Sequence, residues 1–231
     1  MRRLRGFTLI ELLVALAVVA MLGLLSWQGI AGMARTREAT AARGDALITL
    51  QASLAQWQAD LDAATALPNQ SAIRWDGLAL LIIRHGADPR TPGLVVSAWT
   101  RRTLAARSGD LAAAAPRDGV SAVQGPYWMR WQSPPVTTRG ELQSALAQAS
   151  QWAQSPGADD RLRETALIPL ADWQVFFYRN DAWTNPQSSS GTAAEALPGG
   201  VRAVLVLPAG DGLSGRLVRD WVRPNLSVSR S

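Results

Sequence analysis

The feature that most constrains this chain is an apolar run near its N-terminus, from Phe7 to Trp27, that contains a single charged residue, Glu11. A helix over residues 7–27 would be about 31 Å long, which matches the hydrocarbon core of a bilayer. The residues before the run include Arg2, Arg3 and Arg5. An acid inside a membrane helix costs up to about 3 kcal/mol and usually has a partner there. We therefore expect a membrane helix in which the single acid, Glu11, has a functional role.

Three interpretations of this run are open. In the first, it is a signal peptide cut after the small residues Gly32-Met33-Ala34, but the run is longer than the apolar part of such a peptide. In the second, it is a plain uncleaved anchor. Neither interpretation gives Glu11 a reason to be present. In the third, the segment is processed just before the run.

The third interpretation agrees with a known family. The residues Gly6-Phe7-Thr8-Leu9-Ile10-Glu11 resemble the cleavage and methylation motif of type IV pilins and type II secretion pseudopilins. The resemblance implies that a prepilin peptidase cuts between Gly6 and Phe7 on the cytoplasmic side and that the new N-terminus at Phe7 is methylated. It also implies that Glu11 contacts the free amine of a neighbouring subunit. Such an amine and carboxylate relieve each other's desolvation in a low-dielectric site.

Further segments resemble one subgroup, the J-type minor pseudopilins of type II secretion. This resemblance implies a structural subunit at the tip of a short periplasmic pseudopilus, which helps to initiate its assembly for export of folded proteins across the outer membrane. The implied partners are the I-, K- and H-type minor pseudopilins, the major pseudopilin and the prepilin peptidase. The alternative is a minor pilin of a type IV pilus or of a DNA-uptake system, which shares the N-terminal motif. The segments concerned are residues 35–40, 57–61, 173–179 followed by Trp183, and 197–204.

The distribution of charge predicts topology and excludes some partners. The basic N-terminal end is expected to stay in the cytoplasm, so that the chain would be a single-pass inner-membrane protein with a periplasmic C-terminal domain. Three of the 23 basic residues precede Phe7, which leaves 20 bases against 18 acids in the processed chain. This small excess does not favour nucleic-acid binding. Cysteine is absent, so neither a disulfide framework nor a thiol nucleophile is expected.

The expected organisation is a leader over residues 1–6, a membrane and assembly helix over 7–27, its amphipathic periplasmic continuation over 28–63, and a β-rich domain over 69–231. Leu47, Leu50, Leu54, Trp57 and Leu61 recur at helical spacing and form what we call the apolar seam. We expect its outer half to pack on the domain. The pattern predicts strands over residues 78–84, 94–102, 126–132, 173–179, 201–207 and 217–222, with a helix over 141–154 and a closing hairpin around 208–212. A long helix followed by strands without βα alternation predicts an α+β fold, with the helix on an antiparallel sheet, as the pilin resemblance also implies.

The residues that carry catalysis elsewhere are scarce. The only histidine, His85, ends an expected strand and is read as a turn residue, and no catalytic or phosphate-binding motif is present. We therefore expect neither an enzyme nor a solute receptor, and no cofactor, metal or small-molecule ligand. Acid clusters such as Asp60 with Asp62, and Asp159-Asp160 with Glu164, lack the spacing of a calcium loop. Of the ten tryptophans, most are expected in the core, and the ones expected as exposed interface anchors are Trp128, Trp131, Trp173 and Trp183.

Overall fold

The computed structural model describes residues 9–68, 70–103, 125–188, 197–210 and 213–224. The chain divides into two compact units, Met1–Ala46 and Leu47–Ser231. In the first unit the described residues form one long helix. The second unit contains the end of that helix and all of the strands.

The N-terminal helix α1 runs from Leu9 to Asp62. Its sequence has no proline and is rich in alanine and leucine, which are strong helix formers. Ala63 and Ala64 leave the helix in a turn, and Pro68 follows soon after, as expected for a chain that cannot continue the helix. The prediction of a long N-terminal helix followed by an antiparallel sheet domain is confirmed.

A five-stranded antiparallel sheet has the order β1-β2-β3-β4-β5. Its strands are β1 (Ile73–Trp75), β2 (Ala79–His85), β3 (Leu94–Thr103), β4 (Pro126–Gln132) and β5 (Glu164–Pro169). Helix α3 (Arg139–Gln154) covers one face of this sheet through Leu142, Leu146 and Trp152. The helix begins at a capping box, in which the Thr138 hydroxyl accepts a hydrogen bond from the Glu141 backbone N–H.

A four-stranded antiparallel sheet has the order β7-β6-β8-β9. Its strands are β6 (Asp172–Arg179), β7 (Ala182–Thr184), β8 (Gly200–Leu207) and β9 (Gly215–Val222). Two short helices, α4 (Ala158–Arg161) and η1 (Pro186–Ser188), lie in the connections. Strands β8 and β9 pair without a register shift, from Gly200 opposite Val222 to Leu207 opposite Gly215. The predicted closing hairpin is therefore confirmed.

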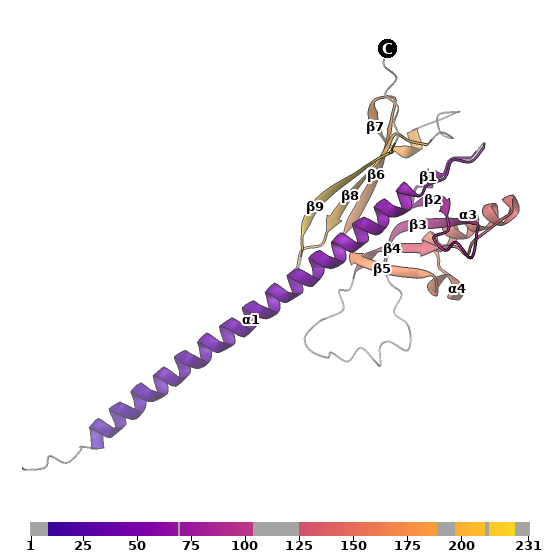
Figure 1. Cartoon of the computed structure of the whole chain (residues 1–231). Helices are drawn as coiled ribbons and strands as arrows, with labels where there is room; N and C mark the ends of the chain where they lie inside the picture. The colour runs from indigo at the N-terminus through magenta and orange to yellow at the C-terminus, as the bar shows by residue number, and fades with distance from the viewer. Residues whose placement is uncertain (1–8, 69, 104–124, 189–196, 211–212, 225–231) are drawn as a thin grey trace, which may run out of the picture. The chain divides into compact units, whose positions relative to one another are not determined.

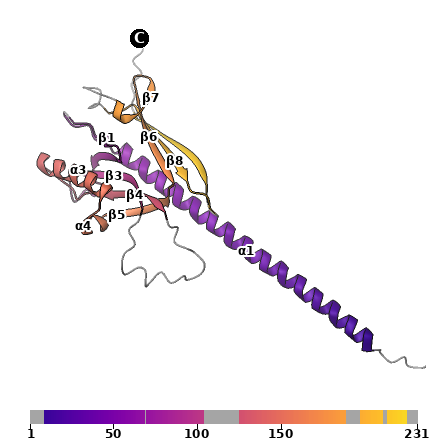
Figure 2. The ribbon, with the colours of Figure 1, turned by 180° about the vertical axis from the view of Figure 1, so that it is seen from behind.

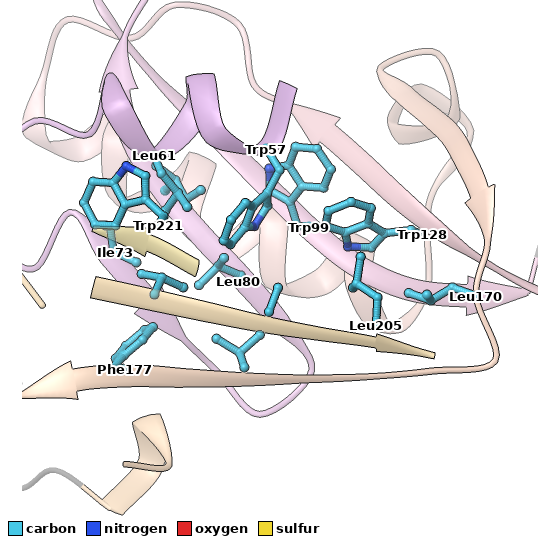
Figure 3. Packing of buried hydrophobic residues seen from close by; sticks show 14 of the residues in the cluster. Trp57, Leu61, Ile73, Leu80, Trp99, Trp128, Leu170, Phe177, Leu205 and Trp221 are labelled. Atoms are coloured by element: carbon cyan, nitrogen blue, oxygen red, sulfur yellow. The ribbon is translucent and has the colours of Figure 1, made fainter. Parts of the chain in front are cut away.

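The end of α1 lies between the two sheets, as both views of the ribbon show (Figure 1, Figure 2). Trp57 and Leu61 of the apolar seam are buried there. They pack in one core with Trp99 and Trp128 of the five-stranded sheet and with Trp221 of the four-stranded sheet (Figure 3). Leu50 and Leu54 pack against the edge of this core, while Leu47 is 41% exposed. The outer half of the seam thus packs on the domain, as expected.

The six predicted strands and the helix over 141–154 are all present, with ends that differ by one or two residues. Three strands were missed. β1 and β7 have three residues each, too few to show a period of two. β5 follows the run Asp159-Asp160-Arg161 and ends in Pro169, so its composition reads as a loop although it pairs with β4.

Candidate functional site

The first part of α1 presents apolar side chains on every side, with none of them covered. All residues from Leu9 to Ile30 are exposed; Leu9 is 78% and Trp27 is 72% accessible. A helix that is apolar all round is stable only inside a protein or a membrane. By length and composition, α1 can cross a membrane once. The exposed surface of this segment is therefore a site for lipid, for other helices, or for both.

Glu11 lies in the first turn of α1 and is exposed like its apolar neighbours. Within the described residues of the first unit, the next acid along the chain is Glu38. Gly6 and Phe7, the predicted cleavage and methylation residues, lie outside the described residues.

The other end of α1 carries a buried acid that binds two arginines of the five-stranded sheet. Asp60 is 1% exposed. Its carboxylate accepts hydrogen bonds from Arg130 Nε at 2.8 Å and Nη2 at 2.9 Å, and it forms an ion pair with Arg84 at 3.1 Å. The indole Nε1 of Trp99 donates to the same carboxylate at 2.9 Å. We call Asp60, Arg84 and Arg130, with Ser97 and Gln132 beside them, the Asp60 network.

Ser97 and Gln132 accept further hydrogen bonds from the two arginines. Arg84 Nε donates to Ser97 Oγ at 2.9 Å, and Arg84 Nη2 donates to Gln132 Oε1 at 2.8 Å. Arg130 Nη2 donates to the same Gln132 oxygen at 2.9 Å. Burial lowers the pKa of Arg84; the charge of Asp60 opposes this shift and the charge of Arg130 adds to it. One carboxylate thus compensates the buried guanidinium of Arg84 and the partly buried guanidinium of Arg130, and ties the helix to β2 and β4.

A second pair of contacts ties the same turn of α1 to the four-stranded sheet. Asp62 accepts a hydrogen bond from Trp221 Nε1 at 2.7 Å, and Gln58 accepts one from Arg219. Both donors lie on β9. The end of α1 is therefore bonded to both sheets as well as packed between them.

The structure places the four predicted tryptophan anchors in two groups. Trp128 and Trp131 are fully buried, so the expectation that they are exposed was wrong. β4 is an interior strand with both faces covered: Trp128 packs in the core beside α1, and Trp131 packs against α3. Trp173 and Trp183 are half-buried, and their interface role stays a prediction.

Trp183 forms part of a polar cluster on the outer face of the four-stranded sheet. The guanidinium of Arg202 lies 4.3 Å from the Trp183 ring centroid and donates two hydrogen bonds of 2.7 Å to Asp220. These hydrogen bonds lower the pKa of Asp220, which its partial burial opposes. The pair is bidentate, which is the strongest arrangement for an arginine and a carboxylate.

The other residues that the sequence analysis considered for catalysis or metal binding lie at the surface or make hydrogen bonds within the domain. His85 is exposed at the end of β2. Asp160 accepts hydrogen bonds from the backbone N–H of Gly157 at 3.0 Å and from Gln148 at 2.8 Å. Glu164 binds Trp152 Nε1 and Arg102. Within the described ranges, no three His, Asp or Glu side chains are placed to hold a metal ion.

Sequence reasoning missed the Asp60 network, although a signal for it existed. Asp60 is three residues after Trp57 and shares its helical face, which places an acid on the buried side. Arg84 directly follows the apolar run of β2, and Arg130 interrupts the apolar run of β4. An acid on a buried helix face and two bases inside buried strands indicate an ion pair, because buried charges need partners.

Comparison with known families identifies only the N-terminal part of the chain. The prokaryotic N-terminal methylation motif matches residues 1–27. No curated protein matches the chain. The motif marks chains that a prepilin peptidase processes and that assemble with other pilin-like proteins. Together with a single long apolar helix and an α+β domain, it indicates a type IV pilin-like protein, either a pilin or a pseudopilin.

Proposed function

We propose that the chain is a minor pseudopilin of the J type, which sits at the tip of the type II secretion pseudopilus and helps to initiate its assembly. Its action is packing and not catalysis. The observation that carries this proposal is the uncovered apolar surface of residues 9–30, most of which lies within the methylation motif matched over residues 1–27. A surface of this kind is stable only when lipid or sister helices cover it.

The assignment to the J type rests on residues 35–40, in the first unit, and on three further segments that pack together. These three segments that resemble J-type chains lie on α1 (residues 57–61), on β6 (residues 173–179), and on β8 with the loop before it (residues 197–204). Each of the three segments contributes to one core: the first through Trp57 and Leu61, the second through Val175 and Phe177, and the third through Val201. Three of the four similar segments therefore meet where the helix packs on the four-stranded sheet, which supports a shared way of holding the helix on the domain.

In this proposal, the inner-membrane peptidase cuts between Gly6 and Phe7, and the apolar helices of several subunits bundle along the fibre axis. Glu11 sets the register of the bundle by contacting the free amine of a neighbouring chain. The desolvation of the amine and of the carboxylate costs little free energy in the bundle because each charge compensates the other. I-type and K-type subunits would share the tip, with H-type and major subunits below, and the folded domain would lie in the periplasm.

The role of Glu11 is tested by Glu11→Ala in the native secretion system. We expect normal removal of residues 1–6, a loss of at least tenfold in the amount of chain recovered with sheared pseudopili, and reduced secretion. The matched control is Glu38→Ala, which removes an exposed acid from the same helix and should leave incorporation unchanged. Normal incorporation of the Glu11→Ala chain would show that the acid does not set the register.

The J-type assignment is tested by co-purification of the full chain in detergent with I-type and K-type pseudopilins from the same genome. We expect a stable complex with one copy of each. If no such complex forms but the chain co-purifies with minor subunits of a type IV pilus, the pilus assignment replaces this one. The control is the Glu11→Ala chain, whose folded domain is unchanged and which should still bind if the domains make the contact.

A further inference from the structure

Two arginines follow the apolar part of α1 and have no counter-charge near them. Arg35 and Arg37 are exposed, and within the described residues neither guanidinium makes an ion pair or a hydrogen bond. On the expected topology both lie on the exported side of the membrane helix, although basic residues usually gather on the cytoplasmic side. Two unpaired charges in an unfavoured place indicate a ligand.

The spacing along α1 places this pair close to the surface of a membrane. Trp27 ends the apolar run and is 72% accessible, and tryptophan is typical of the boundary between the hydrocarbon core and the headgroup layer. Arg35 lies eight residues after Trp27, about 12 Å along the helix. The headgroup layer on each side of a bilayer is about 5–7 Å thick. The backbone of Arg35 therefore lies just outside this layer.

Helix geometry turns both arginine side chains back toward the headgroups. The Cα–Cβ bonds of an α-helix tilt toward its N-terminus, and the apolar segment of α1 is at its N-terminal end. The long stems of Arg35 and Arg37 can therefore run along the helix and bring the guanidinium groups to the headgroup layer. Arg43 is another 12 Å away from the membrane, which is too far for its side chain to reach that layer.

The arrangement around the helix favours a membrane surface over a protein partner. Residues two apart are separated by about 200° around an α-helix, so Arg35 and Arg37 point to nearly opposite sides. A protein that docks on one face would meet only one of them, whereas a membrane surface surrounds the helix and meets both. Glu38 is the next charge along the chain; it lies further from the membrane than either arginine and offsets only part of their attraction.

We propose that Arg35 and Arg37 form a binding site for the phosphates of anionic lipids, at the membrane surface from which the helix emerges. A guanidinium group binds phosphate through two parallel hydrogen bonds. Each basic residue beside an anionic surface strengthens binding about fivefold. The site fixes the depth of the helix in the membrane. This inference rests on α1 spanning a membrane, as in the proposed function, and does not depend on the J-type assignment.

The experiment is a lipid titration of the full-length chain, delipidated in detergent, with bound lipids counted by native mass spectrometry. The probes are phosphatidylglycerol, which is anionic, and phosphatidylcholine, whose phosphate is balanced by a cation. We expect the chain to bind phosphatidylglycerol at least fivefold more tightly. Inorganic phosphate at the same concentration should not displace the lipid, because the apolar helix also holds the acyl chains. Displacement by inorganic phosphate would overturn the assignment to a lipid.

Three variants locate the preference for the anionic lipid. Arg35→Gln combined with Arg37→Gln should reduce it to less than twofold. Arg35→Lys combined with Arg37→Lys keeps both charges and should retain most of it. The matched control is Arg43→Gln, which changes an exposed arginine of the same helix and should leave the preference at the parent value. An equal preference in the parent and in the double glutamine variant, or none in the parent, would overturn the site.

A protein ligand would give a different pattern. If the two arginines bind acids of a neighbouring subunit, the double glutamine variant would lose co-purification with the I-type and K-type pseudopilins and keep the lipid preference of the parent, which would also overturn the site. All of the changes lie at exposed positions of the first unit, so the folded domain should melt at the parent temperature. A chain without lipid preference whose incorporation still requires Glu11 would overturn this site and leave the proposed function standing.

Discussion

We expect Asp60→Ala to lower the free energy of unfolding of the domain by more, for the few atoms that it removes, than other single substitutions. The change deletes a carboxylate that is 1% exposed and that binds Arg84, Arg130 and Trp99. It leaves two guanidinium groups close together, since both donate to Gln132 Oε1. The variant therefore loses two attractions and retains a repulsion, in a place where water reaches the charges poorly.

The magnitude follows from the distances. A pair of unit charges 4 Å apart interacts with about 4 kcal/mol at an effective dielectric constant of 20, and the cost of desolvation cancels part of this. Breaking a buried pair by removing one partner costs about 3–5 kcal/mol. For a unit of this size each kcal/mol lowers the melting temperature by about 2–4 °C. We expect a decrease of about 6–20 °C, out of a typical total stability of about 5–15 kcal/mol.

The assay is unfolding of the purified full-length chain in detergent, by heat and by urea, followed through tryptophan fluorescence. Tryptophan fluorescence follows the unfolding of the whole domain because several of the ten tryptophans are fully buried in its core. The matched control is Asp62→Ala, two residues later on the same helix, which loses the hydrogen bond from Trp221 and should cost about 1 kcal/mol. If Asp60→Ala costs no more than Asp62→Ala, the two arginines do not depend on this acid and the reasoning is wrong.

Two further predictions concern the leader and the outer face of the four-stranded sheet. Gly6→Ala should leave residues 1–6 attached, and mass spectrometry of the membrane-extracted chain would show Met1 in place of a methylated Phe7; a chain that still begins at Phe7 would contradict the cleavage motif. The hydrogen bonds from Arg202 lower the pKa of Asp220, so the pair stabilises the fold above the unfolded-state pKa of about 4. This contribution is lost as the pH falls through the folded value. The difference in melting temperature between the parent and Asp220→Asn should therefore shrink between pH 6 and pH 3, and a difference that does not change with pH would refute the shift.

Much of the fold is readable from the sequence because regular burial leaves a regular pattern. The run Leu80-Leu81-Ile82-Ile83 predicts a strand covered on both faces, and β2 is indeed packed between α1 and α3. The seam predicts which side of α1 meets the domain. The spacing of the apolar residues and the length of each run were enough to predict both elements, because each element buries one or both faces over several turns or residues.

The sequence did not reveal which distant segments pair with each other. β5 forms only because β4 offers it an edge, and its own residues resemble a loop. Trp128 and Trp131 were expected at the surface because tryptophan is common in interfaces, yet β4 lies inside its sheet with a layer on each face. Burial of this kind depends on neighbours that are distant in sequence; the bond from Arg130 to Asp60, for example, joins residues 70 positions apart.

The Asp60 network also explains how a repetitive apolar seam finds one position on the sheets. Leu50, Leu54, Trp57 and Leu61 repeat at helical spacing, so a slip by one turn, about 5.4 Å, would exchange one apolar side chain for another at modest cost. The same slip would leave Asp60 and two arginines unpaired. A polar group in a buried seam can fix register in this way. We expect the triple variant Asp60→Leu, Arg84→Met, Arg130→Met to recover most of the stability that Asp60→Ala loses, but to show more than one ¹⁵N indole resonance for Trp99. A single Trp99 resonance would mean that apolar packing alone sets the register.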